Sequence, residues 1–451
     1  MRRLICATLT LCLGSSLLTP ALATPTLAAA TPSKAVYDVA MRSNATGTQW
    51  RGRQKVYFTN TSAKPLKEIY LRLWGNGLDG CGTTSRPSPV RVSRLTGGKP
   101  APLTVRCSAL RIDLPKPLQR GARGHVAFDL SIDVPTRLNR FGRLGQHNFL
   151  GNALPVLAVR DAGGWRLDPD VGIGESFYTL TSDFLVRLNH PKALAVPATG
   201  LSSKQPAPGG RVTTVALARK VRDFAWAAGP FKSASATSPG GIRVNLHWTA
   251  GTAPASINAV RREALAVMDD LGRRFGKYPY GEVDLVLSPG FQPIGSMEYP
   301  GFVLVAVDGV ESATVHELAH QWWYGIIGND EYADPWLDEA FAVYSQDLFY
   351  GEKAVGCWNE VYWDNNEQAI SNSMGYWARH GRGWSFFVYF AGSCVLHELE
   401  RTIGETAMAR LMKSYARAHW HGVSTNADFK AAAAKVSGKD LTQFWHEHRI
   451  R

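Results

Sequence analysis

Thr314-Val315-His316-Glu317-Leu318-Ala319-His320 is the segment of the 451-residue chain that says most about its fold and its chemistry. Residues four apart lie on one face of an α-helix, so the segment predicts a helix that presents two imidazoles side by side. Two imidazoles in that arrangement can bind one Zn²⁺ ion. The carboxylate of Glu317, next to the first imidazole, can act as a general base. The segment therefore predicts a helix that carries part of a hydrolytic zinc site.

The alternative is that the pattern arises by chance and that the two histidines are an ordinary pair of buried, hydrogen-bonded side chains. Two other segments of the chain resemble the motif without its geometry. His397-Glu398-Leu399-Glu400-Arg401 lacks the second His, and His446-Glu447-His448 places its histidines on different helix faces. A third ligand elsewhere in the sequence is needed to decide between the two readings.

Glu339 supplies that third ligand. It lies in Trp336–Ala342, which begins a second helical segment, and the glycines of 325–328 allow a turn between the two helices. Three protein ligands with one open position are typical of a catalytic zinc site. We therefore predict one Zn²⁺ per chain, bound by His316, His320 and Glu339.

Two further acids lie close to this third ligand. Asp334 and Asp338 are candidates for carboxylates that orient the ligating imidazoles. They are equally well explained as acids at the start of a helix, where the helix dipole favours negative charge.

From about residue 35 to residue 231 the pattern is typical of β-strands. Segments such as Gln54–Asn60, Ile69–Trp74 and His125–Val134 mix β-branched, aromatic and polar residues, with Gly- and Pro-rich turns between them. This series predicts a β-sandwich or saddle. The breaker-rich stretch Ser233–Gly241 follows and indicates a domain boundary, so we assign residues 31–232 to an N-terminal β domain and 240–451 to a second domain.

The second domain has a different period of apolar residues. Ser256–Phe275 has helical spacing, Glu282–Leu287 and Phe302–Val307 are predicted as short strands, and the chain is mostly helical from Glu311 onward. Strands followed by helices predict an α+β, multidomain protein.

The N-terminus has the layout of a secretory signal peptide over residues 1–30. Met1-Arg2-Arg3 precedes a short apolar run at 4–18, and small residues follow. The apolar run is short for a membrane span, which leaves an uncleaved anchor as the alternative. We expect a secreted protein without stable membrane insertion.

Cysteine usage fits an exported protein. Four cysteines remain beyond the signal segment, and they allow three pairings. Proximity in sequence favours Cys81–Cys107 and Cys357–Cys394, and four reduced, buried thiols are the alternative.

The net charge of +13 and pI of about 9.5 would suit an anionic partner such as nucleic acid. The Lys and Arg residues are dispersed, however, and no run of them marks a binding arm. A basic, soluble exoenzyme explains the charge without such a partner, so we expect no nucleic-acid binding.

Taken together, these segments resemble the aminopeptidase N family of zinc metallopeptidases (family M1, the gluzincins), in a short, secreted, bacterial-type form. The two histidines and Glu339 match the metal signature of that family. Gly295-Ser296-Met297-Glu298-Tyr299 resembles its Gly-x-Met-Glu-Asn motif, and Tyr389-Phe390-Ala391-Gly392 resembles the segment with its catalytic tyrosine. Val221–Trp226 and Tyr278–Tyr280 are similar to further landmarks of the family.

The resemblance implies an N-terminal β-saddle domain packed on a thermolysin-like, mostly helical catalytic domain. It also implies that Glu298 binds the free α-amino group of a peptide and that Tyr389 stabilises the oxyanion, with Tyr376 as the second choice. Without the resemblance, Glu298 is equally well explained as a solvated carboxylate in a loop, and Tyr389 is better explained as a tyrosine of the core.

Two points depart from the family pattern or stay open. Tyr299 stands where many members have Asn, which changes how the amine pocket is closed. In longer members a Gln or Glu of the N-terminal domain also helps to bind the amine, and Gln146 lies in the corresponding region without an assignment.

We therefore predict a secreted zinc metallopeptidase, an aminopeptidase whose substrates are peptides with a free N-terminus. A zinc endopeptidase with the same metal site is one alternative. The other is an inactive, secreted binding protein with a peptidase fold, which the intact set His316, Glu317, His320 and Glu339 argues against. The sequence does not indicate an oligomeric state.

Overall fold

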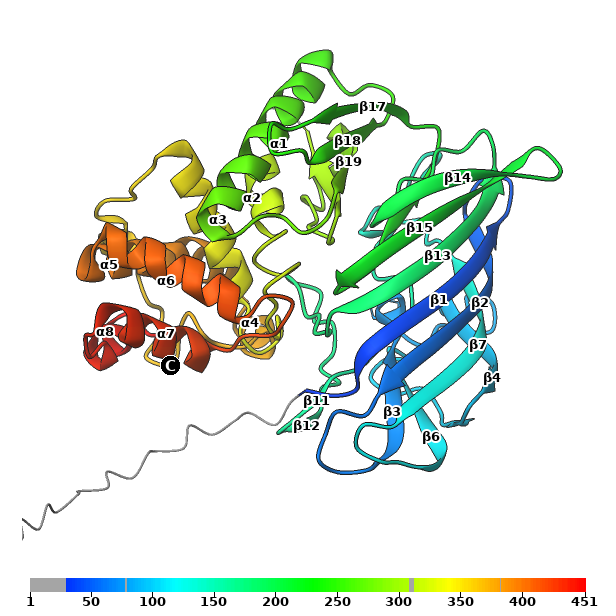
Figure 1. Ribbon diagram of the computed structural model, residues 1–451, viewed down its shortest axis with the longest axis horizontal. Coiled ribbons are helices and arrows are strands. Elements are labelled where there is room, and N and C mark those ends of the chain that lie inside the picture. Colours follow the sequence, from blue (N-terminus) through cyan, green and yellow to red (C-terminus); the bar gives the residue numbers. More distant parts are fainter. Residues whose placement is uncertain (1–29, 78, 308–311, 382) are drawn as a thin grey trace, which may run out of the picture.

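The computed structural model describes residues 30–451 apart from 78, 308–311 and 382 (Figure 1). The predicted signal peptide, residues 1–30, lies outside the described residues except for its last residue, so it stays a prediction. No helix among the described residues is long and apolar enough to cross a membrane.

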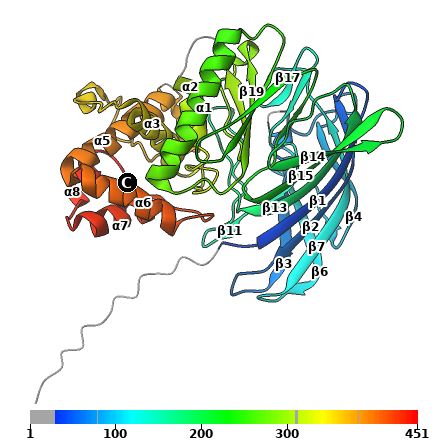
Figure 2. The same ribbon diagram turned by 45° about the horizontal axis from the view of Figure 1, so that its top comes forward.

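The N-terminal part is built on a seven-stranded sheet with the strand order β14-β15-β13-β1-β2-β7-β4 (Figure 1). Its strands are β1 (Ser33–Ser43), β2 (Gln49–Thr59), β4 (Val90–Thr96), β7 (Arg123–Asp133), β13 (Ser182–Pro191), β14 (Leu201–Ala207) and β15 (Arg211–Val221). Every second residue of β13 is buried, because alternate side chains of a strand point to opposite faces. One face of the sheet is therefore apolar and needs a second layer to cover it. Figure 2 shows the pronounced curvature of this sheet.

Smaller sheets form that second layer. A four-stranded sheet has the order β10-β3-β6-β5, a three-stranded sheet has the order β16-β9-β8, and β11 pairs with β12. Their bounds are β3 (Leu66–Arg72), β5 (Lys99–Pro100), β6 (Ala109–Leu118), β8 (Phe141–Leu144), β9 (His147–Leu150), β10 (Val156–Leu157), β11 (Arg160–Asp161), β12 (Gly164–Trp165) and β16 (Trp226–Ala228), with the 3₁₀ turn η1 (Trp74–Asn76). Residues of both layers share one hydrophobic core, in which the rings of Trp50 and Trp226 meet edge to face. The predicted β-sandwich is confirmed.

The C-terminal part combines a small sheet with helices. The sheet has the order β17-β18-β19-β20, formed by β17 (Lys232–Thr237), β18 (Arg243–Trp248), β19 (Glu282–Ser288) and β20 (Phe302–Ala306). All residues of β19 and β20 are buried. This is typical of a central parallel strand such as β19, while β20 lies at the edge of the sheet, where Met297 bridges to its Leu304.

Helices make up most of the remainder (Figures 1 and 2). They are α1 (Pro254–Phe275), α2 (Ser312–Ala319), α3 (Trp336–Tyr350), α4 (Met374–His380), α5 (Gly392–Ile403), α6 (Glu405–Ala418), α7 (Asn426–Ser437) and α8 (Thr442–Glu447), with the short turns η2 (Pro289–Phe291) and η3 (Cys357–Glu360) and the π-helical turn η4 (Phe386–Ala391). A single large core joins α1, α2, α3, α5, α6 and the small sheet. The predicted α+β fold class, with a mostly helical second domain, is confirmed.

One local interpretation of the sequence is wrong. The stretch Ser233–Gly241 was expected to be a breaker-rich boundary, but residues 232–237 form the edge strand β17, paired with β18 along its whole length. Small polar residues suit this strand because most of it is exposed and needs no apolar face. The glycines at 240 and 241 belong to the hairpin turn. The domain division itself stays a prediction.

Arg222 fixes the junction between the two parts of the molecule. Its buried guanidinium donates to the backbone carbonyls of Thr179, Tyr324, Ile326 and Gly422. A guanidinium carries five N–H donors in a rigid fork, so one side chain can satisfy several carbonyls of both parts. A small apolar core between β9, β16 and β20 supports the same junction.

The structure contains both disulfides that proximity in sequence favoured, Cys81–Cys107 and Cys357–Cys394. The second joins the short turn η3 to α5, within the helical part that carries the candidate site.

Candidate functional site

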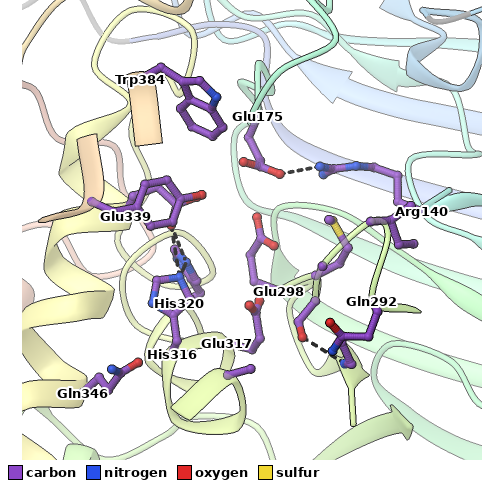
Figure 3. Close-up of a pocket in the computed structure, with 18 residues that line it drawn as sticks. Arg140, Glu175, Gln292, Glu298, His316, Glu317, His320, Glu339, Gln346 and Trp384 are labelled. Atoms are coloured by element: carbon purple, nitrogen blue, oxygen red, sulfur yellow. Dashed lines mark hydrogen bonds and ion pairs between the residues drawn. The ribbon is translucent and has the colours of Figure 1, made fainter. Parts of the chain in front are cut away.

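Helices α2 and α3 bring three metal-ligand side chains to one point (Figure 3). His316 lies in α2, and His320 directly follows that helix, with its backbone N–H donating to the carbonyl of His316. The two Nε2 atoms lie 3.1 Å apart. Oε2 of Glu339, from the first turn of α3, lies 3.1 Å from Nε2 of His316 and 3.2 Å from that of His320.

This donor set fits a zinc ion. Ligand atoms at ~2.0–2.1 Å from one tetrahedral ion lie roughly 3.3 Å from one another, close to the observed separations. Two imidazoles and one carboxylate, with one side open to a cavity, are the ligand types of a catalytic rather than a structural zinc site. Within the part of the chain that the structure describes, no other group of three His, Cys, Asp or Glu residues converges in this way.

A backbone carbonyl orients the second imidazole. Nδ1 of His320 donates to the carbonyl of Trp323 at 2.9 Å, which fixes the tautomer and turns Nε2 toward Glu339. Asp338, one of the two acids considered for this task, instead accepts a hydrogen bond from Asn329. For His320, the expectation of an orienting carboxylate is therefore wrong.

Glu317 faces the same cavity and is nearly buried. Its Oε2 has no hydrogen-bond partner, which is costly for a buried carboxylate unless a ligand or water occupies the space before it. Burial, reinforced by the charge of Glu298, raises the pKa of Glu317 well above its ordinary value. A carboxylate with a raised pKa and a free oxygen is suited to accepting a proton.

Tyr389, and not Tyr376, lies at the metal-ligand group. It belongs to the π-helical turn η4, its hydroxyl donates to Oε1 of Glu339, and its ring stacks on that of His316 at 5.8 Å between centroids. Burial and the charge of Glu339 raise the pKa of Tyr389, so its hydroxyl stays protonated and able to donate. Tyr376 stacks on His380 instead and does not line the cavity.

Glu298 reaches the cavity from the loop before β20. Its side chain is nearly buried, and its neighbour Met297 is bridged to Leu304 of β20, which holds the loop against the small sheet. Figure 3 shows Glu298 and Glu317 facing the histidines across the cavity.

The N-terminal domain contributes two residues that sequence reasoning missed. Glu175 and Arg140 form a largely buried ion pair that lines the cavity (Figure 3). Burial raises the pKa of Glu175 to about 7. The negative charges of Glu298 and Glu339 also raise this pKa, whereas the charge of Arg140 lowers it. Gln146, the residue considered for this position, lies in the exposed turn between β8 and β9 and does not line the cavity.

A glycine allows the loop with Glu175 to enter the site. Gly174 has a φ of +51°, and a Cβ at this position would lie 2.9 Å from the ring of Trp384. The Gly172-Ile173-Gly174-Glu175 sequence was the available signal, because two glycines just before an acid often mark a loop that approaches a site closely.

The resulting cavity has a volume of about 520 Å³, enough for one or two amino-acid residues. Four carboxylates and one guanidinium face it, so the cavity favours a cation. Its remaining wall is apolar or uncharged and includes Gln292, Ile294, Met297, Ala306, Ala313, Gln346 and Trp384.

Comparisons with known proteins find similarity to one family of peptidases. Residues 263–448 match the peptidase family M1 domain. The chain is 26% identical over 197 residues to aminopeptidase N of Streptomyces lividans, covering 36% of this chain and 22% of that protein. It is also 26% identical over 253 residues to aminopeptidase N of Lactococcus lactis subsp. lactis, covering 49% and 29%. The chain thus spans less than a third of the length of these curated relatives.

Solved structures share the fold over almost the whole chain. An M1 zinc metallopeptidase from Deinococcus radiodurans has a TM-score of 0.70 at 18% identity and covers 94% of both chains. A mutant of such an enzyme from the same organism, bound to a Tyr-Ser-Ala substrate, has a TM-score of 0.69 at 19% identity, covering 94% of this chain and 96% of that one.

Proposed function

We propose, from the match of residues 263–448 to the peptidase family M1 domain, that this chain is a zinc-dependent aminopeptidase of that family. Its substrates would be peptides with a free N-terminus, from which it removes the first residue. The observation that carries the proposal is one cavity that holds both a three-donor metal set and, opposite it, the buried carboxylates of Glu298 and Glu175. A peptidase that cuts within a chain has no use for acids at the position of the substrate amine.

The metal would be held by His316, His320 and Glu339. When bound, zinc supplies a Lewis acid that polarises the carbonyl of the first peptide bond and makes water more acidic. The residues of the chain perform the remaining steps.

Glu317 moves the proton. As water attacks the carbonyl carbon, Glu317 accepts one of its protons, which its unpartnered oxygen and raised pKa favour. It then transfers this proton to the leaving nitrogen as the C–N bond breaks, so that an amine leaves and a carboxylic acid remains. Tyr389 donates its hydroxyl hydrogen to the oxygen that carries the developing negative charge.

Glu298 and Glu175 would bind the substrate's ammonium group. Their position decides which peptide bond lies at the metal, because the amine and the carbonyl of the first peptide bond belong to the same residue. Arg140 keeps Glu175 in place through the buried ion pair.

A panel of aminoacyl-aminomethylcoumarins beside an N-acetylated control tests this proposal. We expect release only from free-amine substrates, abolished by a chelator and restored by Zn²⁺. Cleavage of the blocked control would favour a zinc endopeptidase, and no cleavage at all would favour an inactive binding protein.

We also propose that the protein is exported. The basic and then apolar N-terminal segment and the two disulfides support this. Mass spectrometry of the protein from the culture medium should find a new N-terminus near residue 30, whereas an intact N-terminus on a cell-bound protein would contradict export.

A further inference from the structure

The loop that carries Glu298 is tied to the metal-binding segment by one side chain. Gln321 directly follows His320 and is completely buried. Its Nε2 donates to the backbone carbonyls of Glu298 and Tyr299 at 3.3 and 3.2 Å. Its Oε1 accepts from the backbone N–H of Gly301 at 2.7 Å and from the hydroxyl of Tyr278 at 3.3 Å.

These four bonds use the full capacity of the amide, which has two N–H donors and an oxygen with two lone pairs. Three of the four partners are backbone groups of residues 298–301, so the side chain fixes the path of the loop and not merely one side chain in it. Because Gln321 is completely buried, loss of the amide would leave these groups unpaired and free to shift.

The opposite side of the loop is held by the N-terminal domain. The hydroxyl of Tyr299 donates to Oδ1 of Asn152 at 2.9 Å, and Asn152 donates in turn to the carboxylate of Asp223. A Cβ at Gly151 would come within 2.0 Å of the Tyr299 hydroxyl oxygen, so only glycine allows the ring to lie there. Tyr299 thus reaches from the loop to the N-terminal domain.

We propose that Gln321 is a positioning residue for Glu298, which sets the separation between the amine-binding carboxylate and the metal donor set. The inference rests on the proposed amine role of Glu298. One peptide unit advances the chain by 3.8 Å, so the site can select the first bond only if this separation is held to a fraction of that length. A displacement of about 1 Å can reduce catalysis by ~10²-fold. Since Gln321 and His320 are adjacent in the chain, a single side chain joins the two halves of the site.

Two ligands separate this role from a merely structural one. Leucine hydroxamate has the free amine, and 4-methylpentanehydroxamic acid is the same molecule without it. Calorimetry gives the dissociation constant of each for the zinc-loaded protein, and their ratio measures the advantage conferred by the amine. In Gln321→Met we expect this ratio to fall about tenfold, the effect of ~1.4 kcal/mol, while the affinity of the amine-free ligand and the zinc content stay within about twofold.

Tyr299→Phe is the second variant, because it removes a single hydroxyl and keeps the ring. We expect a fall of about threefold in the same ratio, again with unchanged affinity for the amine-free ligand. If Gln321→Met fails to fold, this variant decides. Ser345→Ala is the matched control, since it removes buried hydrogen bonds with Trp323 and Phe341, and Ser345 does not contact the loop.

The outcomes distinguish the inference from the function on which it rests. If Glu298→Gln leaves the ratio unchanged, the amine role of Glu298 is wrong, and the proposed function loses its basis. If Glu298→Gln abolishes the advantage but neither Gln321→Met nor Tyr299→Phe reduces it, only the positioning role is overturned. A parallel loss of affinity for both ligands would also overturn it, because it would indicate general damage to the metal site.

Discussion

The two walls of the cavity are specified in different ways. The metal wall comes from α2 and α3, whose ligands are close in sequence and follow the helical repeat. The amine wall is assembled from a loop before β20 and from the N-terminal domain, with Glu298 and Glu175 far apart in the chain. Local spacing therefore encodes the metal ligands, whereas only the packing of the N-terminal and helical parts brings together the residues of the proposed amine site.

The largest expected effect concerns the metal wall. Glu317→Gln should keep full zinc content but reduce kcat by ~10³-fold or more, since a general base contributes about 10²–10⁴-fold. Metal analysis and steady-state kinetics on a free-amine substrate measure both quantities. Turnover within tenfold of the wild type would show that another group moves the proton.

Glu298→Ala should damage the amine wall alone. We expect kcat/KM for free-amine substrates to fall by ~10²-fold with zinc content unchanged, because the loss of a charged partner costs a few kcal/mol. An equal effect on binding of a ligand without an amine would mean that the residue acts by shaping the cavity.

The contrast between the walls also shows what the sequence could reveal. His316, His320 and Glu339 were identified because one helical turn and one connecting loop suffice to bring them together. Glu298 and Tyr389 were found through the family resemblance, and the structure places both at the cavity. The β-sandwich and the helical domain follow from the change in apolar period between the two halves.

The features that the sequence did not reveal were missed for two different reasons. Arg140 and Glu175 lie 35 residues apart, so their ion pair forms only when the N-terminal domain folds, and the two glycines before Glu175 were the only signal in the sequence. The strand β17 was missed because an exposed edge strand needs no apolar alternation, so small polar residues resembled a linker.

The contribution of Asp223 to the stability of the fold should depend on pH. Burial raises the pKa of Asp223 to about 7, against about 3.9 in an unfolded chain. The folded protein then binds the proton more tightly than the unfolded chain, so the contribution of Asp223 to stability falls as pH rises from ~4 to ~7. Relative to Asp223→Asn, the wild type should lose about 1.6 kcal/mol of unfolding free energy between pH 5.5 and 7.

Urea denaturation of both proteins across this range measures the difference. A difference that does not change with pH would mean that Asp223 has the same ionisation in the folded and unfolded states. The network from Tyr299 through Asn152 would then end on a permanently charged carboxylate.

The smallest effect on kinetics should come from a substitution of Glu175, the acid that the N-terminal domain contributes to the cavity. Glu175→Gln keeps the shape of the side chain and removes its charge, so KM for free-amine substrates should rise about tenfold while kcat changes little. Kinetics at fixed pH on one substrate measure this. A fall in kcat with unchanged KM would place Glu175 in the chemical step instead of in amine binding.

The order in which an unblocked hexapeptide is degraded tests the central claim most directly. The purified protein with zinc should release residues one at a time from the N-terminus, so that mass spectrometry finds a ladder of products with intact C-termini. A chelator should abolish the ladder, and N-acetylation of the peptide should prevent it. Internal fragments, or cleavage of the acetylated peptide, would contradict the account, because neither requires the amine site formed by Glu298 and Glu175.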